Sequence, residues 1–148
     1  MSARYRIEEG SIDLPQGFVD RSTNVFVPAQ GTPPPVSLNI SRDTLTEGAT
    51  LASYVEQQIV LLKANLRNYT IINRSEAKLG TGNHALAGEQ VIATHGDKKA
   101  IIYLRQAAFI HAPQRVLVLS CTSAKALDGE QEATWQQWLA SFQAAGSD

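Results

Sequence analysis

Residue types that carry catalysis or hold metals are few in this sequence, and they are scattered. His84, His95 and His111 each stand near a predicted turn, without a metal-ligand neighbour at i+4 or in a Cys-x-x-Cys cluster. Cys121 is the single cysteine. It could act as a nucleophile only if the fold brought a histidine beside it, and a buried, inert cysteine is the interpretation we favour. We therefore expect no enzyme, no metal and no cofactor.

A second group of polar residues is uncharged and stands in line with apolar neighbours. The segment Val36–Arg42 alternates strictly between apolar and small polar residues, which is typical of a strand with one face on the core. Its polar side chains are those of Ser37, Asn39 and Ser41. Because they are small and uncharged, this face can accept a close neighbour and offer it hydrogen bonds.

The clearest predicted helix, over Thr50–Tyr69, carries an amide on its apolar side. Its apolar residues recur at steps of three and four and so form one stripe: Leu51, Val55, Ile59, Leu62, Leu66 and Tyr69. Thr50 is a suitable N-cap. Gln58 falls inside the stripe, where two interpretations stay open. Either its amide bonds a neighbouring backbone group or meets water at the stripe's edge, or the stripe is partly an open groove and Gln58 serves a bound guest.

The strand predicted over Ala100–Ile110 repeats this pattern. Ile102 and Gln106 share one face of it, so a second amide stands in line with apolar side chains. The uncharged polar residues are interleaved with apolar Val25, Leu62, Leu66 and Ile102. If all of these lined one concave face, its guest would be mainly apolar with some polar atoms, as a hydrophobic helix is.

Several strand-like segments and a second helix complete the prediction. The strands are expected at Arg4–Glu8, Ser11–Leu14, Phe18–Val27, Val36–Arg42, Thr70–Ala77, Gln90–Thr94, Ala100–Ile110 and Val116–Leu119. The proline-rich stretch Pro28–Pro35 predicts a stiff, extended connector. The second helix begins at the cap Asp128 and buries an edge formed by Trp135, Trp138, Leu139 and Phe142. The pattern predicts an α+β fold, with a curved, mostly antiparallel sheet flanked by two main helices at about 50–68 and 128–143.

Length and composition exclude several classes of protein. The 148 residues suit one domain, which we take to span 1–148. A net charge of −1 without basic clusters gives no sign of nucleic-acid binding. No stretch is long and apolar enough to span a membrane, and the first residues lack the apolar core of a signal peptide. We therefore expect a cytosolic protein.

Three motifs in order resemble a known family. The run VSLNISRD, a helix containing SYVEQQ, and then YLRQAAFI are similar to the Eag-type effector chaperones of bacterial type VI secretion. These belong to a DcrB-like family that shares its fold with the PsbP proteins. The resemblance implies a non-enzymatic homodimer. Such a dimer holds the hydrophobic N-terminal transmembrane helices of a secreted effector, next to its PAAR region, until the effector is loaded on the secretion spike.

The resemblance also implies which residues line the binding groove. Apolar positions on an early strand match Thr23 and Val25, and serines on the next strand match Ser37 and Ser41, with Asn39 between them. A glutamine and two apolar residues on the helix match Gln58, Leu62 and Leu66. A glutamine on a later strand matches Gln106, with Ile102 on the same face. Thr23 and Asn39 depart from the family pattern, because both are more polar than the positions they match.

Two other functions remain open at this point. The chain could be an adaptor that binds a folded surface of the effector or spike, or a small-molecule-binding α+β domain that uses Cys121 or a histidine.

Overall fold

The computed structural model describes residues 3–28 and 36–145. Along the chain, the elements are β1 (Ala3–Ile7), β2 (Gly10–Leu14), β3 (Asn24–Phe26), β4 (Val36–Thr44), α1 (Leu51–Asn65), β5 (Thr70–Leu79), the short 3₁₀ helix η1 (Gly82–His84), β6 (Leu86–Asp97), β7 (Ala100–Ala112), β8 (Arg115–Ser123) and α2 (Gly129–Ala140). Of the predicted connector Pro28–Pro35, residues 29–35 lie outside the described residues.

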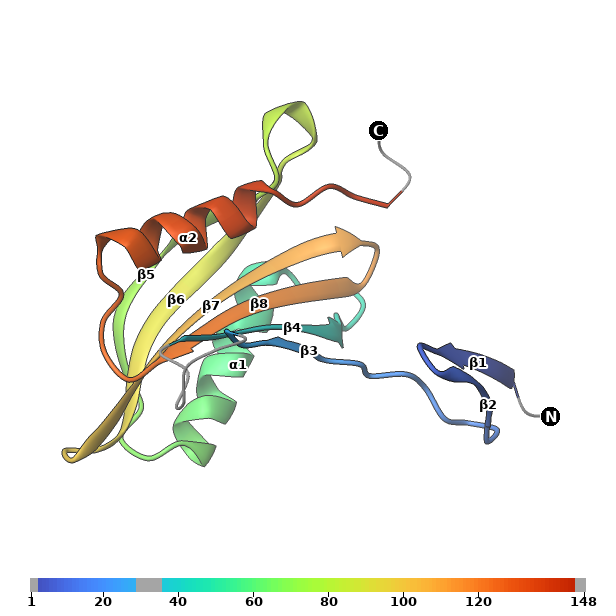
Figure 1. The fold of residues 1–148 in the computed structure, drawn as a ribbon, viewed down its shortest axis with the longest axis horizontal. Coiled ribbons are helices and arrows are strands. Elements are labelled where there is room, and N and C mark those ends of the chain that lie inside the picture. Colours follow the sequence, from blue (N-terminus) through green and yellow to red (C-terminus); the bar gives the residue numbers. More distant parts are fainter. Residues whose placement is uncertain (1–2, 29–35, 146–148) are drawn as a thin grey trace.

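Six strands form one antiparallel sheet in the order β3-β4-β8-β7-β6-β5 (Figure 1). The apolar run in β8 predicts a strand covered on both faces, and residues 116–121 are all buried. The two helices pack on opposite faces of this sheet. The predicted α+β fold is thus confirmed, with shorter helices than expected.

Helix α1 covers one face with its N-terminal half. Thr50 caps it as predicted, since the Ser53 N–H donates to Thr50 Oγ1 at 3.1 Å. Tyr54, Val55 and Ile59 are buried against apolar residues of β6, β7 and β8. The helix ends at Asn65, and Asn68 then turns the chain with φ of 56°, a conformation that asparagine tolerates better than most residues.

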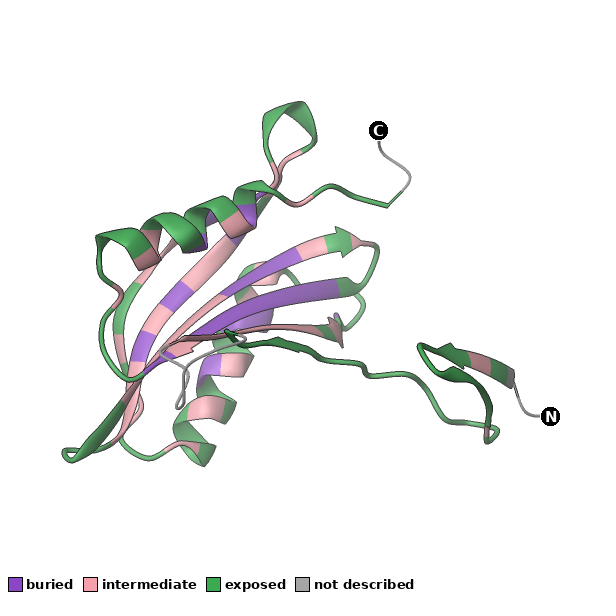
Figure 2. Cartoon of the chain, viewed as in Figure 1, coloured by how far each residue is buried: buried purple, intermediate pink, exposed green. Residues whose placement is uncertain are grey.

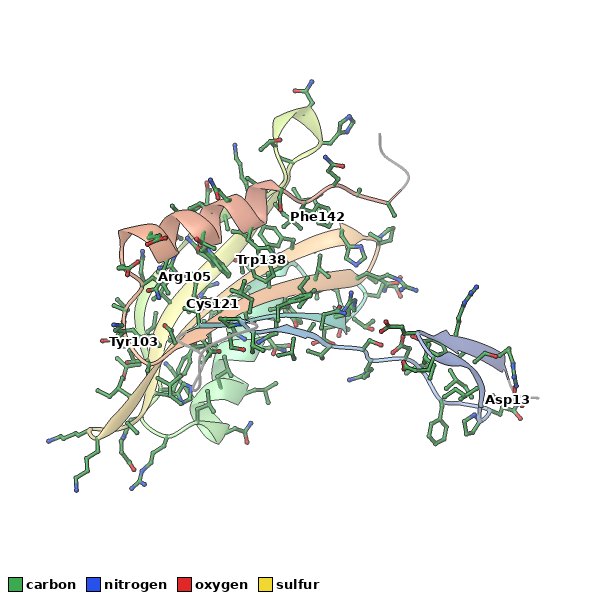
Figure 3. All side chains as sticks on the ribbon, viewed as in Figure 1. Asp13, Tyr103, Arg105, Cys121, Trp138 and Phe142 are labelled. Carbon is green, nitrogen blue, oxygen red and sulfur yellow. The ribbon has the colours of Figure 1, made fainter. Side chains whose placement is uncertain are left out.

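Helix α2 closes the other face. Trp135 and Leu139 are almost fully buried, and Trp138 and Phe142 pack beside them, as the spacing predicts. Figure 3 labels Trp138 and Phe142 where they lie under α2, on the same face of the sheet as Cys121 and Arg105. Asp128 caps the helix by accepting from the Gln131 N–H at 2.8 Å.

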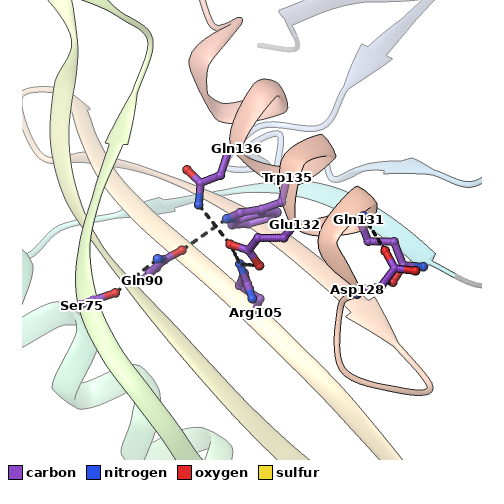
Figure 4. Close-up of polar contacts among 8 residues, drawn as sticks. All are labelled: Ser75, Gln90, Arg105, Asp128, Gln131, Glu132, Trp135 and Gln136. Carbon is purple, nitrogen blue, oxygen red and sulfur yellow. Dashed lines mark hydrogen bonds and ion pairs between the residues drawn. The ribbon is translucent and has the colours of Figure 1, made fainter.

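Polar contacts fix α2 on the sheet (Figure 4). Arg105 of β7 pairs with Glu132 at 2.7 Å, and its guanidinium lies 5.8 Å from the centroid of the Trp135 ring. The Trp135 indole N–H donates to Gln90 Oε1 at 3.3 Å, and the Gln90 amide donates to Ser75 Oγ at 3.2 Å. These contacts cross-link α2 to β6 and β7.

The first third of the chain differs most from expectation. The strand predicted over Phe18–Val27 is reduced to the three residues of β3, which pair with residues 38–40 of β4. Residues 18–23 belong to no strand. An alternating sequence predicts an extended backbone, but it does not show whether another strand lies beside it to form hydrogen bonds. Strands β1 and β2 do form as predicted, but as a separate hairpin beside the sheet (Figure 1). No helix in the part of the chain described here is long and apolar enough to cross a bilayer.

Candidate functional site

The uncharged polar residues predicted from sequence meet on the α1 face of the sheet. Successive pairs in register link Val25 to Asn39, Asn39 to Ser120, Ser120 to Gln106 and Gln106 to Val91. Side chains paired in register project from the same face of a sheet. One row running across five strands therefore holds three of the predicted residues.

The rows on either side of this one add three more predicted residues to that face. Ser41 pairs with Val118 in one row, and Ser37 pairs with Thr122 in the other. Ile102 lies on the same face two pleats from Gln106 and pairs with His95. Figure 2 shows that β4 is largely half-buried and the C-terminal half of α1 largely exposed, whereas the central strand β8 is buried.

Between this face and α1 lies an open hollow with an empty volume of about 610 Å³, counted with its opening to solvent. Four predicted residues line it: Ser41 from β4, Gln106 from β7, and Gln58 and Leu62 from α1. Apolar walls come from Val55, Ile59, Val91, Ala108 and Val118. The hollow exists because the first turns of α1 are buried on the sheet, whereas Leu62 and the following turn are only half-buried or exposed.

The amide of Gln58 has no hydrogen-bond partner among the described residues. Gln106 has one long contact, in which its Nε2 donates to Ser120 Oγ at 3.5 Å. The described side chains of Ser37, Asn39 and Ser41 likewise make no hydrogen bond within the chain, and none of these polar atoms is fully buried. The interpretation in which Gln58 bonds a neighbouring backbone group is therefore wrong, and its donor and acceptor are free for water or a guest.

Two carboxylates border the hollow, and both have partners. The Tyr54 hydroxyl donates to Asp43 Oδ2 at 2.9 Å. Burial, aided by this carboxylate, holds the pKa of Tyr54 above its usual value, so the phenol stays a neutral donor. Arg74 Nε donates to Glu89 Oε1 at 2.7 Å, and Arg74 also pairs with Glu56. The alternation of Val36–Arg42 predicts a lining without charge, and this is wrong, because Arg42, Asp43 and Glu89 all line the hollow. Each of the three has a hydrogen-bond partner within the chain.

Six of the ten predicted residues do not line the hollow. Ser37, Asn39, Ile102 and Val25 lie on the same face of the sheet outside it, and Thr23 and Leu66 lie elsewhere. Thr23 is exposed in the segment before β3 and belongs to no strand, so alternation with Val25 does not bring it onto the sheet. Leu66 is the C-cap of α1 and is half-buried at the end of the helix. Val25 is on the correct face, but 64% of it is exposed at the outer strand.

Sequence reasoning missed several residues of this face. Ser120 and Thr122 continue the alternation of Val116 and Val118 on β8, and the prediction stopped that strand at Leu119. Extending the period-two pattern by two pleats would have found both residues. Tyr54, Tyr69 and Glu89 also line the hollow, but only the fold brings them there.

Cys121 and the histidines do not form a reactive site in the described residues. The cysteine is 3% exposed on the α2 face, and burial raises the pKa of its thiol above the usual value. A nucleophilic cysteine needs the opposite shift. His84 and His111 are exposed, whereas His95 is half-buried near the end of β6. Residues 3–28 and 36–145 contain no cluster of three His, Cys, Asp or Glu side chains that could hold a metal ion.

Comparisons with known proteins agree with the sequence motifs. The DcrB family model matches residues 9–141. The chain is 28% identical over 134 residues to the effector EagT6 of Pseudomonas aeruginosa, and the match covers 90% of both chains. The predicted resemblance to DcrB-like proteins of the Eag type is confirmed by these two findings.

A solved structure with the same fold covers nearly the whole chain. A Pseudomonas aeruginosa protein of unknown function, PA94, superposes with a TM-score of 0.73 at 24% identity, covering 99% of each chain. The Ran-binding protein Mog1p of Saccharomyces cerevisiae gives a TM-score of 0.47 at 12% identity, covering 95% of this chain and 85% of that one. Because the family match extends over nearly all of the sheet and both helices, this chain belongs to the DcrB family.

Proposed function

We propose that this chain is a cytosolic, non-enzymatic chaperone of type VI secretion, which shields the hydrophobic N-terminal transmembrane helices of an effector until it is loaded on the spike. The helices it holds lie next to the effector's PAAR region. The observation that carries the proposal is the hollow on the α1 face, where the unpartnered amide of Gln58 and hydroxyl of Ser41, with the amide of Gln106, stand among aliphatic side chains. The similarity to effector EagT6 is the reason for naming an effector as the guest.

The chemistry of the lining suits a hydrophobic helix. Burying apolar surface contributes about 25 cal/mol per Å², so even two or three side chains seated in the hollow contribute several kcal/mol before the costs of binding. The amides of Gln58 and Gln106 can meet small polar groups of the guest, which would otherwise be buried without partners.

The carboxylates do not oppose such a guest. An unpaired charge covered by an apolar helix would weaken binding, because removing water from the charge costs free energy. Glu89 keeps Arg74 as its partner and Asp43 keeps Tyr54, so covering the hollow leaves neither carboxylate without a hydrogen bond.

Co-expression with the N-terminal fragment of the cognate effector tests the proposal. We expect the fragment, which carries the apolar segments and the PAAR region, to be soluble and to co-purify only when this chain is present. A fragment that is equally soluble without the chain would rule out a shielding role, and would favour an adaptor for an already folded surface. Fragments lacking the apolar segments serve as the matched control and should not be retained.

A further inference from the structure

Exposed apolar side chains gather at one end of the large sheet. Of the large hydrophobic residues exposed in the described part of the chain, those beyond residue 27 are Val60, Leu61, Ile72 and Ile101. They come from the C-terminal half of α1, the start of β5 and the start of β7. Apolar surface gathered in this way marks an interaction site. We name this end the basic tip, for the charges described below, and define it as residues 60–72 and 95–101.

Hydrogen bonds hold the two segments of the basic tip together. Near the end of β6, the Gly96 N–H donates to the Arg67 carbonyl at 2.7 Å, and the Asn68 side chain donates to the Gly96 carbonyl at 3.1 Å. Arg67 also pairs with Asp97 at 3.2 Å. Figure 1 shows the end of α1 and the turn between β6 and β7 at the lower side of the view. The tip is therefore one surface, although its segments are far apart in the sequence.

The basic tip carries four cations and one carboxylate, in a chain whose net charge is −1. The cations, all exposed, are Lys63, Arg67, Lys98 and Lys99. The carboxylate of Asp97 pairs with Arg67, whereas none of the three lysines pairs with a carboxylate in the described part of the chain. The nearest charged residues on either side of the first segment, Glu56 and Arg74, pair with each other. Only the fold brings these cations to one end, so the sequence contains no basic run.

Unpaired cations beside exposed apolar side chains suit the surface of a bilayer that contains anionic lipids. Lysine and arginine side chains contact the headgroup phosphates, while neighbouring apolar side chains enter the boundary of the acyl chains. A nucleic acid would match the charge of the tip but offers no apolar surface to Val60 and Leu61. None of the exposed side chains of the tip is aromatic, as stacking on single-stranded bases requires.

The basic tip adjoins the hollow without being part of its lining at these positions. Val60 and Leu61 are exposed on α1, whereas Leu62, the next residue, lines the hollow. A surface that receives Val60 and Leu61 therefore leaves the lining of the hollow accessible. Binding at the tip and capture of a guest in the hollow are separate events.

We propose that the basic tip docks the protein on the surface of a bilayer that contains anionic lipids. Its cations contact headgroup phosphates, and Val60 and Leu61 enter the boundary between headgroups and acyl chains. The contact is peripheral and reversible, because it combines a small apolar area with charges that salt screens. It needs no cargo, so it can fail while the proposed chaperone function holds, and the reverse is also true.

Flotation with lipid vesicles tests the docking in the full-length chain without cargo. We expect wild type to float with vesicles made of equal parts of phosphatidylcholine and phosphatidylglycerol, and to stay in solution with phosphatidylcholine alone. Raising the salt concentration from about 50 mM to about 500 mM should release the protein, because salt screens the attraction. Equal flotation with both kinds of vesicle, or flotation with neither, would overturn the proposal.

Charge reversal locates the contact on the protein. Lys98→Glu/Lys99→Glu should lower the partition coefficient onto anionic vesicles by at least about 30-fold, since each cation near such a surface contributes about fivefold and the new carboxylates are repelled. The control Lys78→Glu/Lys125→Glu makes the same change in net charge at two exposed lysines outside the tip. It should bind within about threefold of wild type, because charges far from the contact are screened. Equal losses in both double variants would overturn the proposal.

A change that keeps every charge separates a bilayer from other anionic partners. Val60→Ser/Leu61→Ser should bind anionic vesicles at least about tenfold more weakly than wild type, because two apolar side chains no longer leave water. Both proteins should bind polyglutamate and duplex DNA, which have charge but no acyl chains, equally weakly. Tight binding of wild type to either polyanion, with vesicle binding unaffected by Val60→Ser/Leu61→Ser, would overturn the bilayer in favour of an acidic macromolecule. Far-UV circular dichroism shows that each variant is folded.

Discussion

At the scale of single residues, the free amide of Gln58 distinguishes the candidate site from the rest of the surface. Gln57 provides a matched comparison, because it is the neighbouring residue on α1, has the same side chain and is exposed. Gln58 instead lines the hollow beside Leu62. A substitution that weakens capture of the effector fragment at position 58 but not at position 57 would therefore act through the hollow and not through the stability of the helix.

We expect Gln58→Arg to weaken capture of the effector fragment at least about tenfold, because a guanidinium would have to be buried without a partner. Gln57→Arg should leave capture unchanged. The measurement is the amount of fragment retained by each tagged variant at matched expression, with far-UV circular dichroism to show that both variants are folded. Equal loss in both variants would contradict the assignment of the hollow.

For Cys121 we predict a loss of stability without a loss of capture, the reverse of the effect at Gln58. Cys121→Ser puts a hydroxyl into the apolar layer under α2, so the free energy of unfolding should fall by about 1–3 kcal/mol. Capture of the fragment should not change, because Cys121 is on the other face of the sheet from the hollow. Urea unfolding measures the first effect and co-purification the second. Loss of function in a variant that is still folded would support the small-molecule or hydrolytic alternative.

Glu132 makes stability depend on pH at the α2 face. The hydrogen bond from Arg105 holds the pKa of Glu132 below its usual value of 4.5. A carboxyl whose pKa is lower in the folded state stabilises the fold above its unfolded pKa, and this contribution is lost as the pH falls through the folded pKa. Glu132→Gln should therefore be less stable than wild type by about 1 kcal/mol or less at pH 7, because the Glu132 side chain is 41% exposed and water screens its pairing with Arg105.

As the pH falls below 4.5 and through the lowered pKa of Glu132, the difference between the two proteins should shrink, since wild type then also loses the charge of Glu132. Thermal unfolding of both proteins from pH 3 to pH 7 checks this. A difference that is constant over the whole range would show that the ion pair contributes little.

At the scale of elements, the close approach of β6 and β7 depends on Gly88. A Cβ atom at this position would lie 2.3 Å from the Ala108 carbonyl oxygen and 2.4 Å from the Phe109 ring. Gly88→Ala should therefore destabilise the fold by about 2–4 kcal/mol, because backbone on one side cannot move away. Gly129→Ala, at the first residue of α2, meets no atom within 4 Å and should change stability by less than about 1 kcal/mol. Urea denaturation measures the free energy of unfolding of both variants. Similar losses in the two would contradict the close packing of β6 against β7 at Gly88.

The elements also show what the sequence can and cannot predict. Helix caps at Thr50 and Asp128, the alternation of β4 and the buried run of β8 are local signals, and each was predicted correctly from residues close together in the chain. The prediction of a strand over Phe18–Val27 is wrong for most of its length, since only three of these residues pair with β4. An extended pattern does not say whether a neighbouring strand will pair with it. The end of β8 was missed because its last residues are small and polar.

At the scale of the whole molecule, the two faces of the sheet have different roles. Under α2, aromatic side chains and the Arg105–Glu132 pair hold the helix on the sheet. Under α1, only the first turns of the helix are buried on the sheet, and the hollow opens beyond them. The four predicted residues that line the hollow come from β4, α1 and β7. Their types could be identified from sequence, but only the order of the strands shows that they meet on one face.

The most direct test of the proposed site is to observe the side-chain amides while the guest is bound. Side-chain NH₂ signals of isotope-labelled protein would be compared by NMR, alone and in the co-purified complex with the unlabelled effector fragment. We predict that the signals of Gln58 and Gln106 shift strongly, whereas those of Gln57 and Gln136 stay in place. Unmoved signals at Gln58 and Gln106, or shifts confined to the α2 face, would contradict the claim that hydrophobic helices bind in this hollow.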